Sequence, residues 1–479
     1  MEFDLVVIGS GPGGYKAAIT AAHLGARVAL VERDQPGGTC LNQGCVPKKT
    51  LVYLAALMED VNALNGHGLL GQVRGDFPAA LAHKDEVVAT IRNNFPVWLR
   101  RLGVRVFSGH GRLTAPHRVR VEGTGEAPVE LHGRRVILAT GSRPRDLPSC
   151  PVDGERIITS REFMLSGLPR PASMLLVGGG AIGSELAYLM NQFGAAVTIA
   201  EASDRLLAQP GIPERASRLL EDKLGRLGVT VRKQVTVTAA RPDASGVEVE
   251  FSDGVRERFE RVLVAVGREP LTEGLGLEAS GIAVDADGFI PVTEYAETAV
   301  AGHFAIGDLT RGPMTANAAL HDAKVAAVNA VQDGRMKHNY HRVPVVIDSA
   351  LEVAAVGLTE EQAEAAGFEA DVARSNFAAS AKARGRLDTE GFIEVVHDEE
   401  TGQLLGGCIV GPEAGEQIHM LSAACHSQRG LWFFTDMNYS HPSWCEALEA
   451  AIDPYTSAFS KSGQDLFRPG IFASATEET

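Results

Sequence analysis

The stretch LVVIGSGPGG, residues 5–14, places a short apolar run directly before a glycine-rich turn. The pattern predicts a buried strand over residues 5–8, a helix over residues 15–24 and a second strand over residues 27–31. Glycines allow the backbone to approach a pyrophosphate, and a helix N-terminus supplies amide donors and partial positive charge. The order therefore predicts a Rossmann-type dinucleotide-binding unit, with cofactor contacts from Gly9, Gly11, Gly14 and, at a ribose, Glu32.

The same unit occurs a second time further along the chain. A predicted strand over residues 174–177 precedes GGGAIG, residues 178–183, and another strand is expected over residues 196–200. In both copies the acid follows the first glycine by 23 residues. Two matched copies predict two dinucleotide sites, the second formed by Gly178, Gly180, Gly183 and Glu201. A carboxylate such as Glu201 suits a free 2′-hydroxyl and repels a 2′-phosphate, which favours NAD over NADP.

Length and composition limit the other possibilities. A chain of 479 residues, 45% hydrophobic and 22% charged, is expected to form about three globular domains. The net charge of −15 argues against nucleic acid as a partner, because phosphate neutralisation needs clustered Lys and Arg. No charged leader or long apolar segment precedes the first strand, so we expect a cytoplasmic protein with no membrane insertion.

Two cysteines lie just downstream of the first fingerprint, in GTCLNQGCVPKK, residues 38–49. Cys40 and Cys45 could form a disulfide that exchanges electrons with a cofactor, or be ordinary buried residues, or be half of a metal site. In a reducing cytoplasm, paired cysteines are more often catalytic or metal-binding than structural. The other cysteines suggest no zinc spacing, and no metal site is predicted.

Segments after each of the two glycine-rich turns predict further strands and a separate C-terminal domain. Apolar strands close against glycine turns at Gly141 and Gly267, and residues 304–308 read as a strand ending in Asp308, which could bind a polyol or ribose or simply occupy a turn. Alternation over residues 247–251 suggests an inserted antiparallel sheet. Beyond residue 345 the chain indicates a separate α+β domain, with strands over 392–396 and 404–410 and helices over 413–425 and 445–459.

Taken together, these motifs resemble the pyridine nucleotide-disulfide oxidoreductases that carry FAD, and within them most closely the dihydrolipoamide dehydrogenases. The resemblance runs from about residue 3 to residue 467. It implies an α/β fold with two Rossmann-like domains, for FAD and NAD, and a C-terminal α+β dimerisation domain. The expected division is 1–149 and 275–345 for FAD, 150–274 for NAD and 346–479 for the interface.

The resemblance also implies the cofactor contacts. FAD would bind the first fingerprint, with Glu32 at its adenosine ribose and Asp308 at its ribityl chain, and NAD the second. Thr39 would begin the segment along the isoalloxazine ring. Cys45 would be the thiolate beside the flavin, and Cys40 the interchange thiol that faces the substrate.

The remaining catalytic groups are expected near this disulfide. His441 and Glu446 resemble the family's acid–base dyad, in which imidazole moves a substrate proton and the carboxylate fixes its tautomer. Lys49 matches a lysine near the flavin and is expected to pair with Glu185. In the family the histidine reaches the disulfide of the other subunit, which implies a homodimer acting on a lipoylated carrier protein or domain.

Several residues depart from the dihydrolipoamide dehydrogenase pattern. Lys48 replaces a serine, so that VPKK, residues 46–49, looks like glutathione reductase, whereas Glu201 and GPGGY, residues 11–15, favour the lipoamide enzymes. Tyr439, Trp444 and Cys445 also differ around the dyad, and Cys445 could be reactive or inert. Alternatives are therefore a glutathione reductase-like or other disulfide reductase, and a flavin-bearing assembly scaffold. A scaffold would be expected to have lost a cysteine or the dyad.

Overall fold

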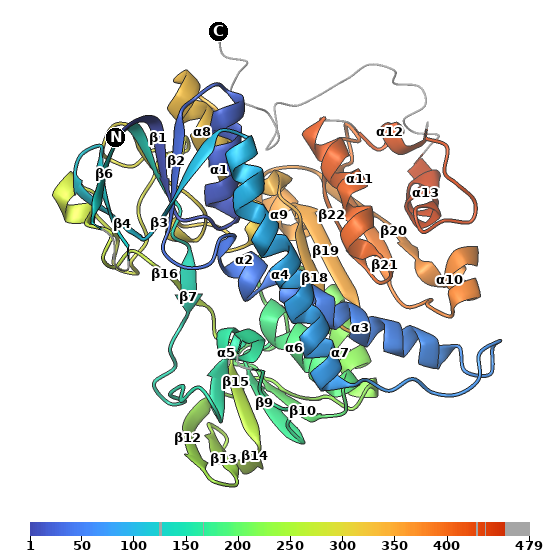
Figure 1. Ribbon diagram of the computed structural model, residues 1–479. Coiled ribbons are helices and arrows are strands. Elements are labelled where there is room, and N and C mark those ends of the chain that lie inside the picture. The colour runs from blue at the N-terminus through green and yellow to red at the C-terminus, as the bar shows by residue number, and fades with distance from the viewer. Residues whose placement is uncertain (124–126, 166, 428–429, 436, 456–479) are drawn as a thin grey trace.

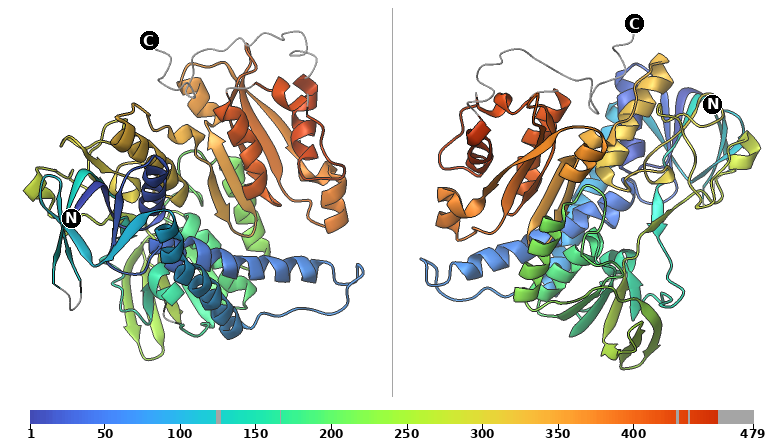
Figure 2. Two further views of the ribbon diagram at one scale, coloured as in Figure 1. Left: turned by 45° about the horizontal axis from the view of Figure 1, so that its top comes forward. Right: turned by 180° about the vertical axis from the view of Figure 1, so that it is seen from behind.

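A computed structural model describes residues 1–123, 127–165, 167–427, 430–435 and 437–455. In Figure 1 one sheet lies on the left, a second below the centre and a third on the right, with helices α3 (Cys45–Ala63) and α4 (Phe77–Arg101) running between them. Figure 2 shows the same grouping from two other directions. The fold is mixed α/β: the first sheet is largely parallel, the second is parallel and the C-terminal sheet is antiparallel, which confirms the predicted fold class.

The first sheet carries the first fingerprint. It has seven strands in the order β3-β2-β1-β6-β5-β4, with β17 added beside β6. β1, β2, β3, β6 and β17 pair in parallel, and β4 and β5 continue the sheet antiparallel. The strands are β1 (Glu2–Ile8), β2 (Val28–Glu32), β3 (Val104–Ser108), β4 (His110–Ala115), β5 (Arg118–Glu122), β6 (Val129–Leu138) and β17 (His303–Ala305).

Two alanine-rich helices, α1 (Pro12–His23) and α8 (Ala316–Gln332), pack together against this sheet. Small buried side chains such as Ala17, Ala18 and Ala326 let the helices come close while excluding water. The predicted first strand and helix are confirmed, each beginning three residues earlier than expected.

The second fingerprint lies in a parallel five-stranded sheet of order β11-β10-β9-β15-β8. An antiparallel sheet β12-β13-β14 is inserted before β15. It confirms the inserted antiparallel sheet that the alternation over residues 247–251 predicted. These strands are β8 (Ile157–Thr159), β9 (Ser173–Val177), β10 (Ala196–Ala200), β11 (Thr230–Arg232), β12 (Val237–Asp243), β13 (Gly246–Phe251), β14 (Arg256–Phe259) and β15 (Arg261–Val264).

Helix α6 (Ala181–Gln192) is buried on every side from Gly183 to Met190, because it packs between this sheet and α3. Two short strands, β7 (Ser142–Pro144) and β16 (Arg268–Pro270), pair antiparallel where the two nucleotide units join. The remaining helices of this part are α5 (Ser160–Leu165) and α7 (Glu214–Arg226).

The C-terminal part is an antiparallel sheet of order β18-β19-β22-β21-β20. Its strands are β18 (Val345–Asp348), β19 (Glu352–Gly357), β20 (Ala370–Asn376), β21 (Phe392–Asp398) and β22 (Leu404–Val410). Its helices are α9 (Glu360–Ala365), α10 (Ala381–Arg386), α11 (Ala414–His426), α12 (Trp432–Thr435) and α13 (Glu446–Ile452). The strand predicted over residues 404–410 has the predicted bounds.

The helix predicted over residues 445–459 is shorter than expected. It ends at Ile452 and continues as a 3-10 turn over Asp453–Tyr455, where Pro454 lacks the amide that an α-helix needs. The last four predicted residues lie outside the described residues. The four-part domain division proposed from the sequence stays a prediction.

Candidate functional site

The first glycine turn has the geometry that a dinucleotide needs. Gly9 has φ 100°, and a Cβ there would lie 2.3 Å from the carbonyl oxygen of Ala139. A Cβ on Gly14 would lie 1.8 Å from the oxygen of Gly9, whereas a Cβ on Gly11 would meet nothing within 4 Å. Gly9 and Gly14 therefore close the turn, and Gly11 borders open space, as a turn that binds a pyrophosphate requires.

Glu32 is fixed at the end of β2 beside this turn. Its Oε2 accepts hydrogen bonds from the N–H and Oγ of Ser10 at 2.9 and 2.7 Å, and its Oε1 accepts from the N–H of Asp34 at 2.8 Å. Oε2 thus uses both of its lone pairs, whereas Oε1 accepts one hydrogen bond and keeps a lone pair for a further donor. The side chain is thus held beside the turn, and its contact with a ribose stays a prediction.

The second turn repeats this arrangement. Gly178 has φ 105°, a Cβ on it would lie 2.5 Å from the oxygen of Ala265, and a Cβ on Gly183 would lie 1.9 Å from the oxygen of Gly178. A Cβ on Gly180 would again meet nothing within 4 Å. Glu201 accepts from the N–H groups of Gly179 and Ser203, both at 2.6 Å. The two units therefore match in their turns and in the hydrogen bonds of their acids.

Cys40 and Cys45 lie together where two helices meet. Cys40 is in the short helix α2 (Gly38–Asn42), directly after the exposed Thr39, and Cys45 is the first residue of α3. A side-chain hydrogen bond joins the two thiols, and it raises the pKa of Cys40. The same bond is the main cause that lowers the pKa of Cys45 to about 7, and the charge of Lys48 lowers the pKa of Cys45 further. The positive end of the α3 dipole acts in the same direction. Cys45 is thus the better thiolate of the two when both are reduced.

The predicted pairing of Lys49 with Glu185 is wrong, because Lys48 occupies that place. Lys48 Nζ lies 2.5 Å from Glu185 Oε1, and Lys49 Nζ instead lies 3.1 Å from Asp348 Oδ1. One residue corresponds to about 100° of helix rotation, so only one of the two lysines can face α6. Lys48 does so, and Lys49 is 54% exposed.

Asp348 was not identified from the sequence. Its Oδ2 lies 3.1 Å from Lys48 Nζ, and its N–H donates to Glu185 Oε1 at 2.9 Å. Glu185 is 3% exposed, and burial raises its pKa, while attraction to Lys48 acts against that rise. Asp348 and Glu185 are 163 residues apart, and a lone acid at the end of a strand gives no local indication of this contact.

Asp308 lies where the two short connecting strands meet. Ser142 Oγ donates to Asp308 Oδ2 at 2.5 Å, and Arg268 Nε donates to Ser142 Oγ at 2.6 Å. Gly141 and Gly267, with φ 75° and 114°, precede Ser142 and Arg268, and a Cβ on either glycine would meet nothing within 4 Å. Burial lowers the pKa of Arg268, whose charge also interacts with Asp308 and Cys45. Ser142 and Arg268 directly follow the two glycines, and the sequence analysis did not predict them as site residues.

The predicted dyad is formed within one loop and helix. His441 Nδ1 lies 2.6 Å from Glu446 Oε1, and the N–H of Ser443 donates to Glu446 Oε2 at 2.6 Å. These contacts lower the pKa of Glu446, the Ser443 bond first. The His441 side chain is 76% exposed, so the imidazole can reach a partner outside its own domain.

The dyad is not brought to the cysteines within one chain. Figure 1 shows α2 near the centre of the molecule and α13 at the right, on the outer side of the C-terminal domain. Around the dyad, Trp444 is 6% exposed and packs edge-on against Phe377 with ring centroids 5.9 Å apart. Burial raises the pKa of Cys445, which disfavours its thiolate at neutral pH.

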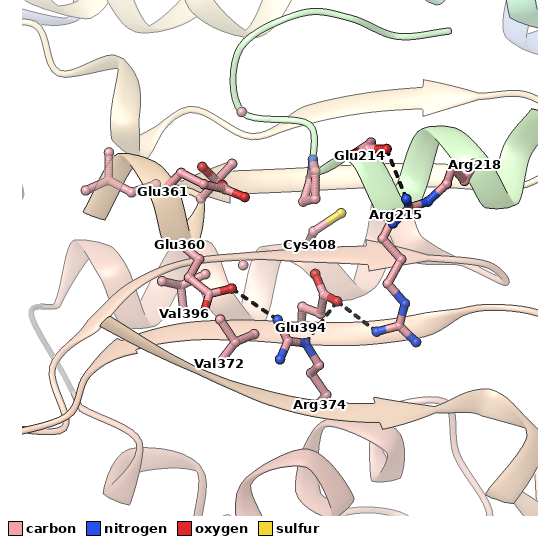
Figure 3. A pocket seen from close by; sticks show the side chains of 15 residues that line it. Glu214, Arg215, Arg218, Glu360, Glu361, Val372, Arg374, Glu394, Val396 and Cys408 are labelled. Carbon is pink, nitrogen blue, oxygen red and sulfur yellow. Dashed lines mark hydrogen bonds and ion pairs between the residues drawn. The ribbon is translucent and has the colours of Figure 1, made fainter. Parts of the chain in front are cut away.

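A cavity of about 280 Å³ lies elsewhere, between α7 and the C-terminal sheet (Figure 3). Arg215 and Arg374 both pair with Glu394, at 2.8 and 3.2 Å, and Arg374 also pairs with Glu360 at 3.2 Å. Its lining includes none of the predicted site residues, so the cavity does not belong to the disulfide centre.

The described residues contain no group of three or more His, Cys, Asp or Glu that could hold a metal ion. No described helix is both long and apolar enough to cross a membrane.

Comparisons with known proteins cover nearly the whole chain. Residues 3–323 match the model of the pyridine nucleotide-disulphide oxidoreductase family, and residues 343–452 match that family's dimerisation domain. The chain is 35% identical to a dihydrolipoyl dehydrogenase of Chlamydia muridarum, over 94% of this chain and 97% of that one. It is 36% identical to dihydrolipoyl dehydrogenase 3 of Pseudomonas aeruginosa, over 95% and 99%.

Two solved structures are also similar to the chain over nearly its whole length. LpdA from Mycobacterium tuberculosis superposes with a TM-score of 0.88 at 27% identity, covering 94% of this chain and 99% of that one. A copper(II) complex of the HOCl-induced flavoprotein disulfide reductase RclA from Escherichia coli gives a TM-score of 0.83 at 27% identity, with coverage of 95% and 99%.

Proposed function

Since the chain belongs to the pyridine nucleotide-disulphide oxidoreductase family, we propose that it oxidises dihydrolipoyl groups on a carrier protein or domain to lipoyl groups, with NAD as the final acceptor. The family consists of flavoprotein disulfide oxidoreductases, which makes an assembly scaffold the poorer interpretation. The observation that carries the proposal is the hydrogen-bonded pair of Cys40 and Cys45 at the N-terminus of α3. The similarity to dihydrolipoyl dehydrogenases over the full length supports the choice of substrate.

The chain's own groups account for each transfer of a proton or sulfur. His441, oriented by Glu446, takes the proton of one substrate thiol through the nitrogen that does not contact the carboxylate. The resulting thiolate attacks the Cys40 sulfur of the disulfide, and Cys45 leaves as a thiolate. The second substrate thiol then attacks the mixed disulfide and releases Cys40, so that the substrate is oxidised by two electrons and the cysteine pair is reduced.

The cofactor sites fit FAD and NAD. Bound FAD supplies the two-electron acceptor next to the cysteines, and NAD the final hydride acceptor. The first glycine turn, Glu32 and Asp308 would hold FAD, and the second turn with Glu201 would hold NAD. Lys48 rather than Lys49 is the buried cation on α3, and it would stabilise a reduced, anionic flavin.

NAD is favoured over NADP by what surrounds Glu201. Both of its oxygens are engaged by backbone N–H groups, so a negative charge is fixed where a 2′-phosphate would lie. The next basic residue along the chain, Arg205, donates to the oxygens of Leu207 and Ile212 and to Ser217 Oγ, which holds its guanidinium there.

A homodimer completes the site in this proposal. The matched dimerisation domain includes His441, and that residue is exposed and remote from Cys40 in one chain. His441 of the partner subunit would therefore serve the disulfide of the first. The oligomeric state and the activity of a mixed dimer of His441→Gln and Cys45→Ser subunits test this point, because such a dimer retains one complete site.

A second candidate function is the reduction of a disulfide such as glutathione disulfide. It is favoured by Lys48 and by the superposition with RclA, which is named a flavoprotein disulfide reductase. Steady-state assays with dihydrolipoamide and NAD, and with glutathione disulfide and either NADH or NADPH, separate the two. The proposed function requires kcat/KM with dihydrolipoamide and NAD to exceed kcat/KM with glutathione disulfide by at least about tenfold, and the opposite order would refute it.

A further inference from the structure

Asp348 is a charged residue at the end of β18 that the proposed mechanism does not use. Its Oδ2 lies 3.1 Å from Lys48 Nζ and its Oδ1 lies 3.1 Å from Lys49 Nζ, so one carboxylate bridges two lysines in the first turn of α3. The main chain that carries this carboxylate is held in place, because the backbone N–H of Asp348 donates to the buried Glu185. A strand of the C-terminal domain thus ends directly over the helix that begins with Cys45.

The two lysines depend on Asp348 to different degrees. Lys48 is 15% exposed and also contacts Glu185 at 2.5 Å, so it stays in place without Asp348. Lys49 is 54% exposed, and within the described part of the chain Asp348 is the only ion-pair partner recorded for it. A lysine with one contact loses much rotamer freedom by staying there, and without that contact it would extend into solvent.

The position of these charges matters for Cys45. Lys48 and Lys49 follow it by three and four residues, which places both on the side of α3 where Cys45 lies. The hydrogen bond from Cys40 lowers the pKa of the Cys45 thiol most, and the ammonium groups of Lys48 and then Lys49 lower it further. A lysine that moves away from this face would stabilise the thiolate less.

We propose that Asp348 is a positioning residue that holds the ammonium group of Lys49 against the first turn of α3, so that Lys49 joins Lys48 in stabilising the Cys45 thiolate. The inference rests on the proposed role of Cys45 as the thiolate of the reduced pair. It does not depend on which substrate reduces that pair.

Other charged or titratable groups also face this cluster. Cys45 is faced by Cys40 from α2, Tyr15 from α1 and Arg268 from β16. Asp348 is paired in register with Glu352 on β19, where burial raises the pKa of Glu352 to about 6. These groups, and His441 of the partner subunit, are unchanged in all variants compared below, so their effects cancel between backgrounds.

The test is a double-mutant cycle on the reduced holoenzyme. Wild type, Lys49→Met, Asp348→Asn and the double variant are alkylated with iodoacetamide across a pH series, and modification of Cys45 is followed by peptide mass spectrometry. In the wild-type background, Lys49→Met should raise the pH midpoint of Cys45 alkylation by about half a unit. Below the midpoint this corresponds to about threefold slower alkylation. In the Asp348→Asn background the same substitution should shift the midpoint by less than half as much.

The cycle has outcomes that overturn the inference. If Lys49→Met shifts the pH midpoint equally in the wild-type and the Asp348→Asn backgrounds, or does not shift it when Asp348 is present, Asp348 does not position Lys49. Asp348→Glu retains a carboxylate and should restore most of the shift, which a purely structural role would not require. If Asp348→Asn does not retain FAD, Asp348→Ser takes its place in the same cycle. Alkylation uses no dihydrolipoyl substrate, so failure of the lipoamide assay would leave this result unaffected.

Discussion

Replacing Lys48 with Met would leave the carboxylate of Glu185 buried without its cation. Glu185 is 3% exposed, and apart from Lys48 its Oε1 accepts from the N–H of Asp348 at 2.9 Å. Removing one partner of a buried ion pair costs about 3 to 5 kcal/mol, because the other charge is left uncompensated. Since the Asp348 N–H still solvates Glu185, we expect Lys48→Met to lower the free energy of unfolding by about 3 kcal/mol at pH 8.

The loss should depend on pH in a defined direction. Burial raises the pKa of Glu185 in the folded protein, whereas an unfolded glutamate loses its proton near pH ~4.3. The folded state therefore binds this proton more tightly, and its contribution to stability is greatest at low pH and falls as the pH rises through the folded pKa. Without Lys48 this fall should be steeper, so the variant should be closer to wild type at pH 5 than at pH 8.

Urea unfolding followed by circular dichroism measures both effects. The matched control is Lys48→Met with Glu185→Gln, which removes both charges and should recover at least half of the lost stability, because Lys49 still pairs with Asp348. A loss below about 1 kcal/mol for the single variant, or a double variant no more stable than the single one, would refute the uncompensated-charge argument.

Four further outcomes follow from the site. His441→Gln should slow dihydrolipoyl-dependent NAD reduction by about 10² to 10⁴-fold while FAD absorbance per protein stays at the wild-type level, and an unchanged steady-state rate would exclude its role in proton transfer. Glu201→Ala should raise the KM for NAD about tenfold and narrow the preference over NADP, and identical KM values would contradict the ribose contact. Gly14→Ala would place a Cβ 1.8 Å from the oxygen of Gly9, so the purified variant should have lost most of its FAD, as judged by flavin absorbance. Because the pKa of Cys45 is lowered to about 7, the rate of Cys45 alkylation in the reduced wild-type protein should reach half its maximum near pH 7. A midpoint near the pKa of an ordinary cysteine, about 8.5, would contradict the lowered pKa.

Local sequence patterns were sufficient for the nucleotide-binding units. An apolar run followed by a glycine turn needs few contacts from elsewhere, and the 23-residue spacing from Gly9 to Glu32 recurs from Gly178 to Glu201. The same spacing reappears in the structure, where both acids accept hydrogen bonds from the residue after the first glycine. The pairing of His441 with Glu446 was also predicted, from the resemblance to the family's dyad, and the structure has this contact.

The contacts that the sequence did not predict are those between distant elements. Which of two adjacent lysines faces Glu185 depends on the rotation of α3 against α6, and no pattern within residues 46–49 determines that rotation. Asp348 reaches the cluster only because the C-terminal sheet docks there, and its contact with Lys48 spans 300 residues. Sequence motifs therefore predicted contacts within one element or loop better than contacts between distant elements.

The most direct test of the account is anaerobic NADH formation from a dihydrolipoyl-bearing carrier domain, comparing wild type with Cys45→Ser. Wild type should form NADH, and the variant should show no detectable turnover although it retains FAD. Wild-type turnover that persists in Cys45→Ser, or a wild-type enzyme that reduces glutathione disulfide but does not oxidise the dihydrolipoyl carrier, would contradict it.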